Sequence, residues 1–239
     1  MTLRNYERTP AGEWVPIPSD DSSFLSDLLA DRWPSTLPRP PVEPDWDRIP
    51  KELQDTPSWV LSTGSEDLDG QRTETGPETG ERRPIPPDGP TRHPFDVITR
   101  AMEGLPNLKG FSNLKPPLHF FLMGTPFTAI TLAARNPETG ELSELGELVM
   151  HTLDTYGQIS QWGDVVTFVL RGVSRFGNLD VGGTMVSGAN VIIHPTGVRL
   201  PGTPTTINDR QEQLDSLCGF LLARAGREAP QSDEDLSAR

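Results

Sequence analysis

Proline is distributed very unevenly along this chain. Of its 25 prolines, 16 lie within residues 1–94. The stretches PSTLPRPPVEPDWDRIP (34–50) and RRPIPPDGPTRHP (82–94) are dense in proline, and GSEDLDGQRTETGPETGE (64–81) is polar and low in complexity. Such segments bury too little apolar surface to offset the entropy of ordering the backbone. The sequence therefore predicts a disordered arm over 1–94, with polyproline II character.

The arm is also acidic. Residues 1–94 carry 10 Lys/Arg against 18 Asp/Glu, which accounts for most of the net charge of −13. Residues 95–207 are close to neutral, with 7 Lys/Arg against 9 Asp/Glu. Non-specific electrostatic binding of nucleic acid or of anionic lipid requires clustered Lys and Arg. We therefore expect no strong direct binding of nucleic acid. Contact with a membrane through apolar surface stays open.

Two apolar islands interrupt the arm. One is IPKELQDTPSWVL (49–61), whose apolar side chains could dock onto another surface. The other, over 22–33, has helical i, i+4 spacing, with serines suited to cap its start and Pro34 to end it. About three turns is too short for a stable isolated helix. We expect this helix to bind a partner protein or to pack on its own folded domain, through Phe24, Leu25, Leu28, Leu29 and Trp33.

From residue 95 the pattern changes to that of a folded domain, expected over 95–226, with a disordered tail over 227–239. A helix is predicted at 95–105, after Pro94 and before Pro106. A last helix follows Asn208, its expected cap, and places Leu214, Leu217, Cys218, Leu221 and Leu222 on one face, before Gly226. Strand-like runs lie between them, at 117–123, 127–135, 147–153, 164–173 and 184–195, with a further short one possible at 197–200.

This order of elements predicts an α+β fold. It consists of a mostly antiparallel sheet of about five or six strands, flanked by an N-terminal and a C-terminal helix. The loop NPETGEL (136–142) has proline and glycine where a hairpin turn requires them.

Cysteine and hydropathy bear on the compartment. The single cysteine, Cys218, excludes an intramolecular disulfide and suits a reducing environment. No run of 18 apolar residues and no signal peptide is present. We expect a protein that is intracellular or packaged within a virion, not secreted, and without a transmembrane segment.

Groups that could carry chemistry are sparse. None of the four histidines has a metal-ligand spacing, so no metal and no cofactor is expected. His151 and Asp154, three residues apart, could support a small hydrolase with Ser160 or Ser187 as nucleophile, although neither serine lies in Gly-x-Ser-x-Gly. Cys218 is expected to be a buried small hydrophobe, and the glycine-rich stretch 176–188 a turn between strands.

In layout, the chain resembles the matrix proteins of rhabdovirus-type negative-strand RNA viruses. The resemblance lies in the flexible proline-bearing arm over 1–94 and one compact domain over 95–226. The stretch HPFDVITRAMEGLPNLKGFSNLKPPLHFFLMGTPF (93–127) is similar to the helix, loop and apolar segment of that family. The resemblance implies self-assembly and binding to nucleocapsid and envelope. The chain departs from the pattern in its acidic arm and in lacking Pro-Pro-x-Tyr, and no functional residue is carried over.

Three hypotheses follow. The leading one is a non-enzymatic structural protein, a viral matrix-like homo-oligomer whose folded domain self-associates and whose arm recruits a protein partner. The second is a soluble adaptor or viral polymerase cofactor, similar in layout to the phosphoproteins of the same viruses, without self-assembly. The third is the small hydrolase that would use His151 and Asp154.

Overall fold

The structure is a computed structural model of the whole chain. It describes residues 6–8, 14–16, 42–66, 72–75, 77, 82–84, 91–104, 118–188 and 191–224. The expected partner-binding helix at 22–33 and the expected tail at 227–239 lie outside these ranges. Within them, no helix combines the length and the apolar character needed to cross a bilayer.

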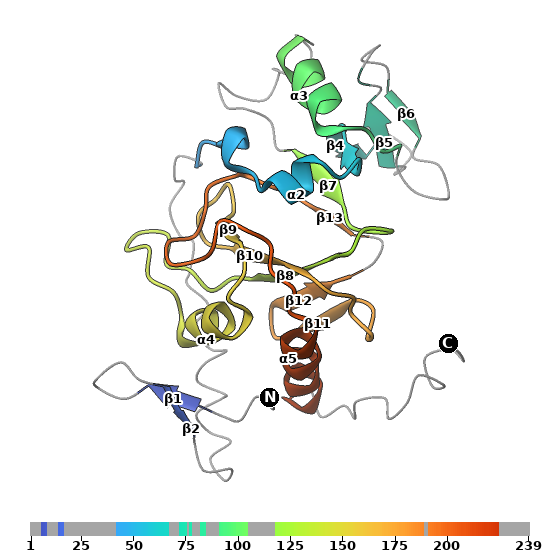
Figure 1. Ribbon diagram of the computed structural model, residues 1–239. Coiled ribbons are helices and arrows are strands. Elements are labelled where there is room, and N and C mark those ends of the chain that lie inside the picture. Colours follow the sequence, from blue (N-terminus) through green and yellow to red (C-terminus); the bar gives the residue numbers. More distant parts are fainter. Residues whose placement is uncertain are drawn as a thin grey trace.

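A five-stranded antiparallel sheet forms the middle of the molecule (Figure 1). Its order is β11 (Leu179–Val181), β12 (Thr184–Ser187), β8 (Phe127–Leu132), β10 (Val166–Arg171) and β9 (Gly157–Ile159). The central pair, β8 and β10, is in register along its whole length, from Val166 opposite Leu132 to Arg171 opposite Phe127.

Strand β8 shows that both faces of this sheet are covered. Successive side chains point to opposite faces of a strand. Ile130 and Leu132 belong to one apolar cluster, whereas Phe127 and Ala129 belong to another. An apolar run without alternation of polar residues is what a strand buried on both sides requires.

Two helices cover the first face. They are α4 (Glu144–Leu153) and α5 (Gln211–Arg224), and both lie below the sheet in Figure 1. In α5, the five residues predicted to share one face are all buried: Leu214, Leu217, Cys218, Leu221 and Leu222. Asn208 does not cap this helix; its side-chain amide instead donates to the carbonyl oxygen of Asp154 (2.6 Å).

The strand predicted at 147–153 is wrong, because these residues form the larger part of α4. Ser143 caps the helix by accepting a hydrogen bond from the amide of Gly146 (3.2 Å). Leu145, Val149 and Leu153 follow at i, i+4 and i+8 and are buried against the sheet. The predicted reversal at 136–142 does occur, with Arg135 bridged to Leu142, but it leads into this helix.

The second face is covered by a smaller layer. Three short strands form it, in the order β13 (Ile192–Ile193), β7 (His119–Phe121) and β3 (Trp59–Val60). Three helices border them: η1 (Trp46–Arg48), α2 (Lys51–Gln54) and α3 (Phe95–Gly104), the last of which confirms the helix predicted after Pro94.

The folded part begins much earlier than residue 95. Residues 42–61 were predicted to belong to the disordered arm, but they contribute a helical turn, a short helix and strand β3. Trp59 is fully buried between Phe95 and Phe120, and its indole nitrogen donates to the carbonyl oxygen of Leu53 (2.9 Å). The boundary at 94/95 therefore requires correction to about residue 42.

Five further strands fall within the range predicted as arm. Strands β1 (Tyr6–Arg8) and β2 (Trp14–Pro16) pair with each other, and β4 (Ser62–Glu66), β5 (Arg72–Thr75) and β6 (Arg82–Pro84) form a three-stranded sheet.

The α+β class with antiparallel sheets is confirmed, since every pairing between named strands is antiparallel. The run 184–195, predicted as one strand, is divided between β12 of the large sheet and β13 of the small one.

Candidate functional site

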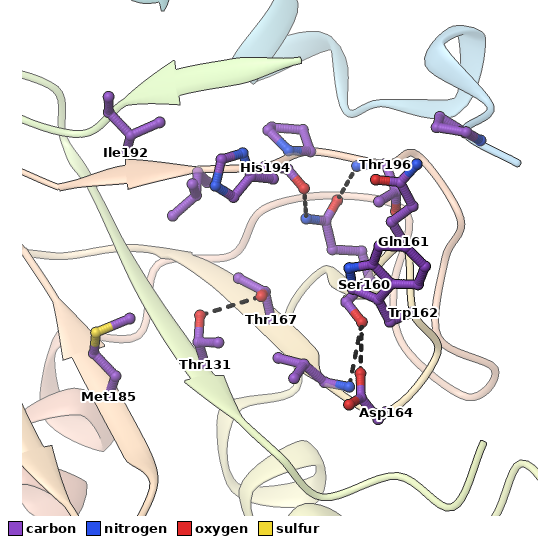
Figure 2. Close-up of a pocket in the computed structure, with 15 residues that line it drawn as sticks. Thr131, Ser160, Gln161, Trp162, Asp164, Thr167, Met185, Ile192, His194 and Thr196 are labelled. Atoms are coloured by element: carbon purple, nitrogen blue, oxygen red, sulfur yellow. Dashed lines mark hydrogen bonds between the residues drawn. The ribbon is translucent and has the colours of Figure 1, made fainter. Parts of the chain in front are cut away.

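A groove opens where the smaller layer leaves part of the large sheet uncovered. Its volume is about 500 Å³. Figure 2 shows its walls: the large sheet on one side, the chain from Ile192 to Thr196 on the other, and the turn after β9 at one end. Of the residues considered from the sequence as parts of a site, Ser160 lines this groove.

The floor of the groove is one row of side chains across the sheet. Met185 lies opposite Thr131, Thr131 opposite Thr167, and Thr167 opposite Gln158. All four residues line the groove. The hydroxyl oxygens of Thr131 and Thr167 are 3.1 Å apart and share a hydrogen bond, as cross-strand threonine pairs do. The floor is thus polar in the middle and apolar at the Met185 end.

Gln158 fixes the opposite wall to this floor. Its amide nitrogen donates to the carbonyl oxygen of His194 (3.1 Å), and its amide oxygen accepts from the backbone amide of Thr196 (3.0 Å). The Tyr156 hydroxyl also donates to that oxygen (3.3 Å). Burial raises the pKa of Tyr156 well above its usual value, so the phenol stays protonated and remains a donor. These bonds join the floor of the groove to its facing wall.

The turn at 160–164 forms the rim. The Ser160 hydroxyl oxygen accepts from the amides of Gly163 (3.2 Å) and Val165 (3.3 Å), and the hydroxyl donates to Asp164 Oδ1 (3.3 Å). Gly163 has a φ of +81°, which glycine adopts without strain. The turn presents Trp162 with 63% of its surface exposed, while Met185 is 39% exposed across the groove.

The N-terminal part of the chain enters the folded domain at this rim. The Val42 amide donates to the carbonyl oxygen of Gln161 (2.6 Å), and the Asp45 amide donates to the carbonyl oxygen of Thr196 (2.8 Å). Pro44, between them, lines the groove. Residue 42 therefore lies beside the turn that carries Trp162.

Two histidines lie at the inner edge of the groove. The rings of His119 and His194 meet edge to face, with centroids 4.6 Å apart, and His194 lines the groove. Burial, reinforced by the nearby His194, lowers the pKa of His119 to about 3. His119 is therefore neutral at physiological pH and packs as a ring rather than carrying a charge.

The residues considered for a hydrolase are not brought together. His151 lies on α4, which covers the other face of the sheet from the groove. Asp154 ends that helix with a φ of 38°, and its carboxylate pairs with Arg210 (2.8 Å). Ser160 is at the groove, where its hydroxyl stabilises the turn, and Ser187 is buried in β12. A base, an acid and a nucleophile within reach of one another are what such chemistry requires.

The other residues considered from the sequence as reactive or binding groups do not form a site among the described residues. Cys218 is buried on α5, where burial raises its pKa to about 12 and disfavours the reactive thiolate. Among the described residues, no three His, Cys, Asp or Glu side chains are grouped closely enough to hold a metal ion. The expected partner-binding residues Phe24, Leu25, Leu28, Leu29 and Trp33 lie outside the described ranges.

No model of a known protein family matches the chain, and no curated protein matches it. The geometry of the groove is that of a partly apolar concavity with an exposed aromatic ring at its rim. Two sequence signals could have indicated it: threonines within otherwise apolar strands, and a tryptophan in the turn SQWGD (160–164).

Proposed function

We propose that this chain is a non-enzymatic structural protein that acts by binding other proteins, in a role comparable to that of a viral matrix protein. Its folded domain self-associates, and its arm recruits a protein partner through residues 22–33. The proposal places the chain inside the cell or within a virion.

The observation that carries the proposal is the groove beside Trp162. Large apolar side chains that remain exposed around a concavity mark sites of protein contact more often than they mark free surface. Tryptophan is also among the residues that contribute most to binding at protein interfaces. The polar groups at this site are used to stabilise the groove: Gln158 bonds the facing wall, and Ser160 bonds the rim.

The arm adds a second contact element. Its apolar positions at 22–33 have the spacing of an amphipathic helix that folds in a partner's groove. A chain with one rigid contact surface and one tethered helix can join two partners, which is what an assembly protein does.

Sedimentation velocity over a wide concentration range tests self-association. We would compare the full chain with the full-length Phe24→Ala/Leu28→Ala variant. Oligomers that grow with concentration in both proteins are expected, because the folded domain is intact in both. A strictly monomeric chain at every concentration would overturn the assembly role and favour the adaptor hypothesis.

Truncation is a poor substitute for this variant. A fragment that begins near residue 91 would lack Trp59 and Leu53, both of which are buried in the core of the smaller layer. Recruitment by the arm is tested separately, with a synthetic 19–34 peptide and its Phe24→Ala/Leu28→Ala counterpart as bait. A partner retained by the first and lost from the second is the expected result, and equal retention would contradict the role given to the helix.

A further inference from the structure

The charge of the groove indicates what kind of segment enters it. Among the described residues that line the groove, Asp164 is the only Asp, Glu, Lys or Arg. Glu43, next in sequence to the lining residue Pro44, is exposed. The acidic character of the site therefore arises from a few residues at its rim, above a neutral floor.

The carboxylate of Asp164 is available to a ligand. Its Oδ1 accepts one hydrogen bond, from Ser160, and no Lys or Arg in the described part of the chain forms an ion pair with it. Arg135 reaches the same turn, but its Nη1 donates to the carbonyl oxygen of Gly163 (2.7 Å) instead. An acidic group held in a fixed turn, without a cationic partner, favours a cation brought by a ligand.

An indole ring lies beside this carboxylate. Trp162 and Asp164 flank Gly163 in one turn, and both line the groove (Figure 2). Tryptophan is the aromatic side chain that attracts a cation most strongly over its face. Arginine suits such a place best, since its planar guanidinium stacks on an aromatic ring and simultaneously donates to a carboxylate.

The remaining walls fit the rest of a polypeptide segment. Met185, Ile192 and Val165 supply apolar surface for the aliphatic part of a long side chain and for its apolar neighbours. The paired hydroxyls of Thr131 and Thr167 keep acceptor capacity at the floor, because only one hydrogen joins them.

The net charge of the chain indicates which kind of protein supplies the segment that enters the groove. The chain carries a net charge of −13, which attracts a basic protein at long range. We propose that the groove binds a segment of a basic partner protein, with an arginine side chain of that segment lying between the Trp162 indole and the Asp164 carboxylate. This inference rests on the proposed role of the groove as a protein-contact site.

The direct test uses two peptides that differ in charge alone. Acetyl-Leu-Arg-Leu-amide and its citrulline counterpart would be titrated into the full chain, with the Trp162 indole N–H followed by NMR. The arginine peptide is expected to shift this signal and to bind about tenfold more tightly than the citrulline peptide, because citrulline keeps the shape and loses the charge. Equal binding of the two peptides, or binding of neither, would overturn the proposal.

Variants then locate the site. Asp164→Asn keeps an oxygen for the Ser160 hydroxyl but removes the charge, and Trp162→Leu removes the aromatic ring. Each is expected to weaken binding of the arginine peptide about three- to fivefold, with isothermal calorimetry as the readout for Trp162→Leu. The matched controls are Glu103→Gln and Val173→Ala, which change an exposed acid on α3 and an exposed apolar residue away from the groove.

The controls are expected to bind the peptide as the unaltered chain does, and equal losses in all four variants would contradict the assignment to the groove. Failure of this inference is distinguishable from failure of the assembly role. Self-association is measured by sedimentation without peptide, so oligomers combined with no discrimination between arginine and citrulline would overturn this inference alone.

Discussion

The backbone amide of Val42 donates a 2.6 Å hydrogen bond to the carbonyl oxygen of Gln161. This bond joins the start of the folded domain to the turn that carries Trp162. It is followed by the bond from Asp45 to Thr196, so the entering chain is fixed on two sides of the groove. The turn that forms the rim and the segment 42–61 are therefore held together as one structural unit.

A substitution at Gly197 tests whether this attachment stabilises the fold. Gly197 has a φ of +72°, and a Cβ added there would collide with the carbonyl oxygen of Asp45. Gly197→Ala is expected to lower the free energy of unfolding by about 3 kcal/mol or more, because the alanine must both adopt a left-handed backbone and displace the entering chain. Urea denaturation measures this change.

Gly177→Ala is the matched control for this substitution. Gly177 has a φ of +65° but no atom within 4 Å of an added Cβ. We expect a loss of about 1–2 kcal/mol, from backbone strain alone. Similar losses in both variants would show that the approach of Asp45 to Gly197 does not hold the segment in place.

Two tryptophans should respond very differently to truncation. Trp59 is fully buried, whereas Trp162 is 63% exposed. Trp59→Ala is expected to cost about 3–5 kcal/mol of stability, from the cavity and the lost bond to Leu53, and Trp162→Ala less than about 0.5 kcal/mol. Chemical denaturation provides the comparison; a small effect at Trp59 would indicate that residues 42–61 contribute little to the core.

Acid should destabilise the protein partly through His119. Its pKa is lowered from 6.5 to about 3 in the folded state, so between these pH values the unfolded chain binds a proton that the native one excludes. Stability therefore falls as pH falls through this window, by up to about 1.4 kcal/mol per pH unit from this one group. Below about pH 3 the native state binds the proton as well, and this contribution levels off.

Replacing the ring isolates that contribution. His119→Phe keeps an aromatic side chain beside His194 and is expected to show a shallower loss of stability between pH 6.5 and 3. Denaturation at a series of pH values measures the slope. The same substitution at His151, which is exposed on α4, serves as the control. Parallel curves for the unaltered chain and His119→Phe would rule out the role given to His119.

Ser187 and Thr155 have buried hydroxyls with opposite expectations. Ser187 Oγ has no hydrogen-bond partner among the described residues, so Ser187→Ala should leave stability unchanged or raise it slightly. The Thr155 hydroxyl donates to the carbonyl oxygen of Val169 (2.8 Å) and accepts from the amide of Asn208 (3.0 Å).

Thr155→Val should therefore cost about 1–3 kcal/mol, since it leaves the amide of Asn208 unsatisfied. Thermal denaturation of the two variants side by side measures the difference. A clear loss of stability in Ser187→Ala would mean that its hydroxyl has a partner after all.

Local patterns predicted the elements whose signals are local. The helix after Pro94 and the apolar face of α5 follow from spacing and helix-ending residues within one segment. The helix at 144–153 carried such signals as well, in the cap at Ser143 and the spacing of Leu145, Val149 and Leu153. Taken alone, the apolar, partly β-branched run from 147 onward favours a strand, whereas the cap at Ser143 and the positions before 147 favour a helix.

The remaining features depend on contacts between distant segments. The order of the proline-bearing segment 42–61 comes largely from packing Trp46, Leu53 and Trp59 against α3 and β7. The groove also depends on contacts between distant segments, since its floor is formed by four strands and its rim bonds to Val42. Pairing across such sequence separations has no signature in a single segment.

The order of the smaller sheet also constrains how the protein is made. Trp59 pairs with Phe120, which in turn pairs with Ile193, so β7 lies between strands from the two ends of the folded part. During translation, the apolar residues around Trp46 and Trp59 emerge before β7, which lies near the middle of the chain, and β3 has no partner strand until β7 has been synthesised. Throughout that interval a chaperone can bind these exposed apolar residues, and a neighbouring nascent chain can mispair with them.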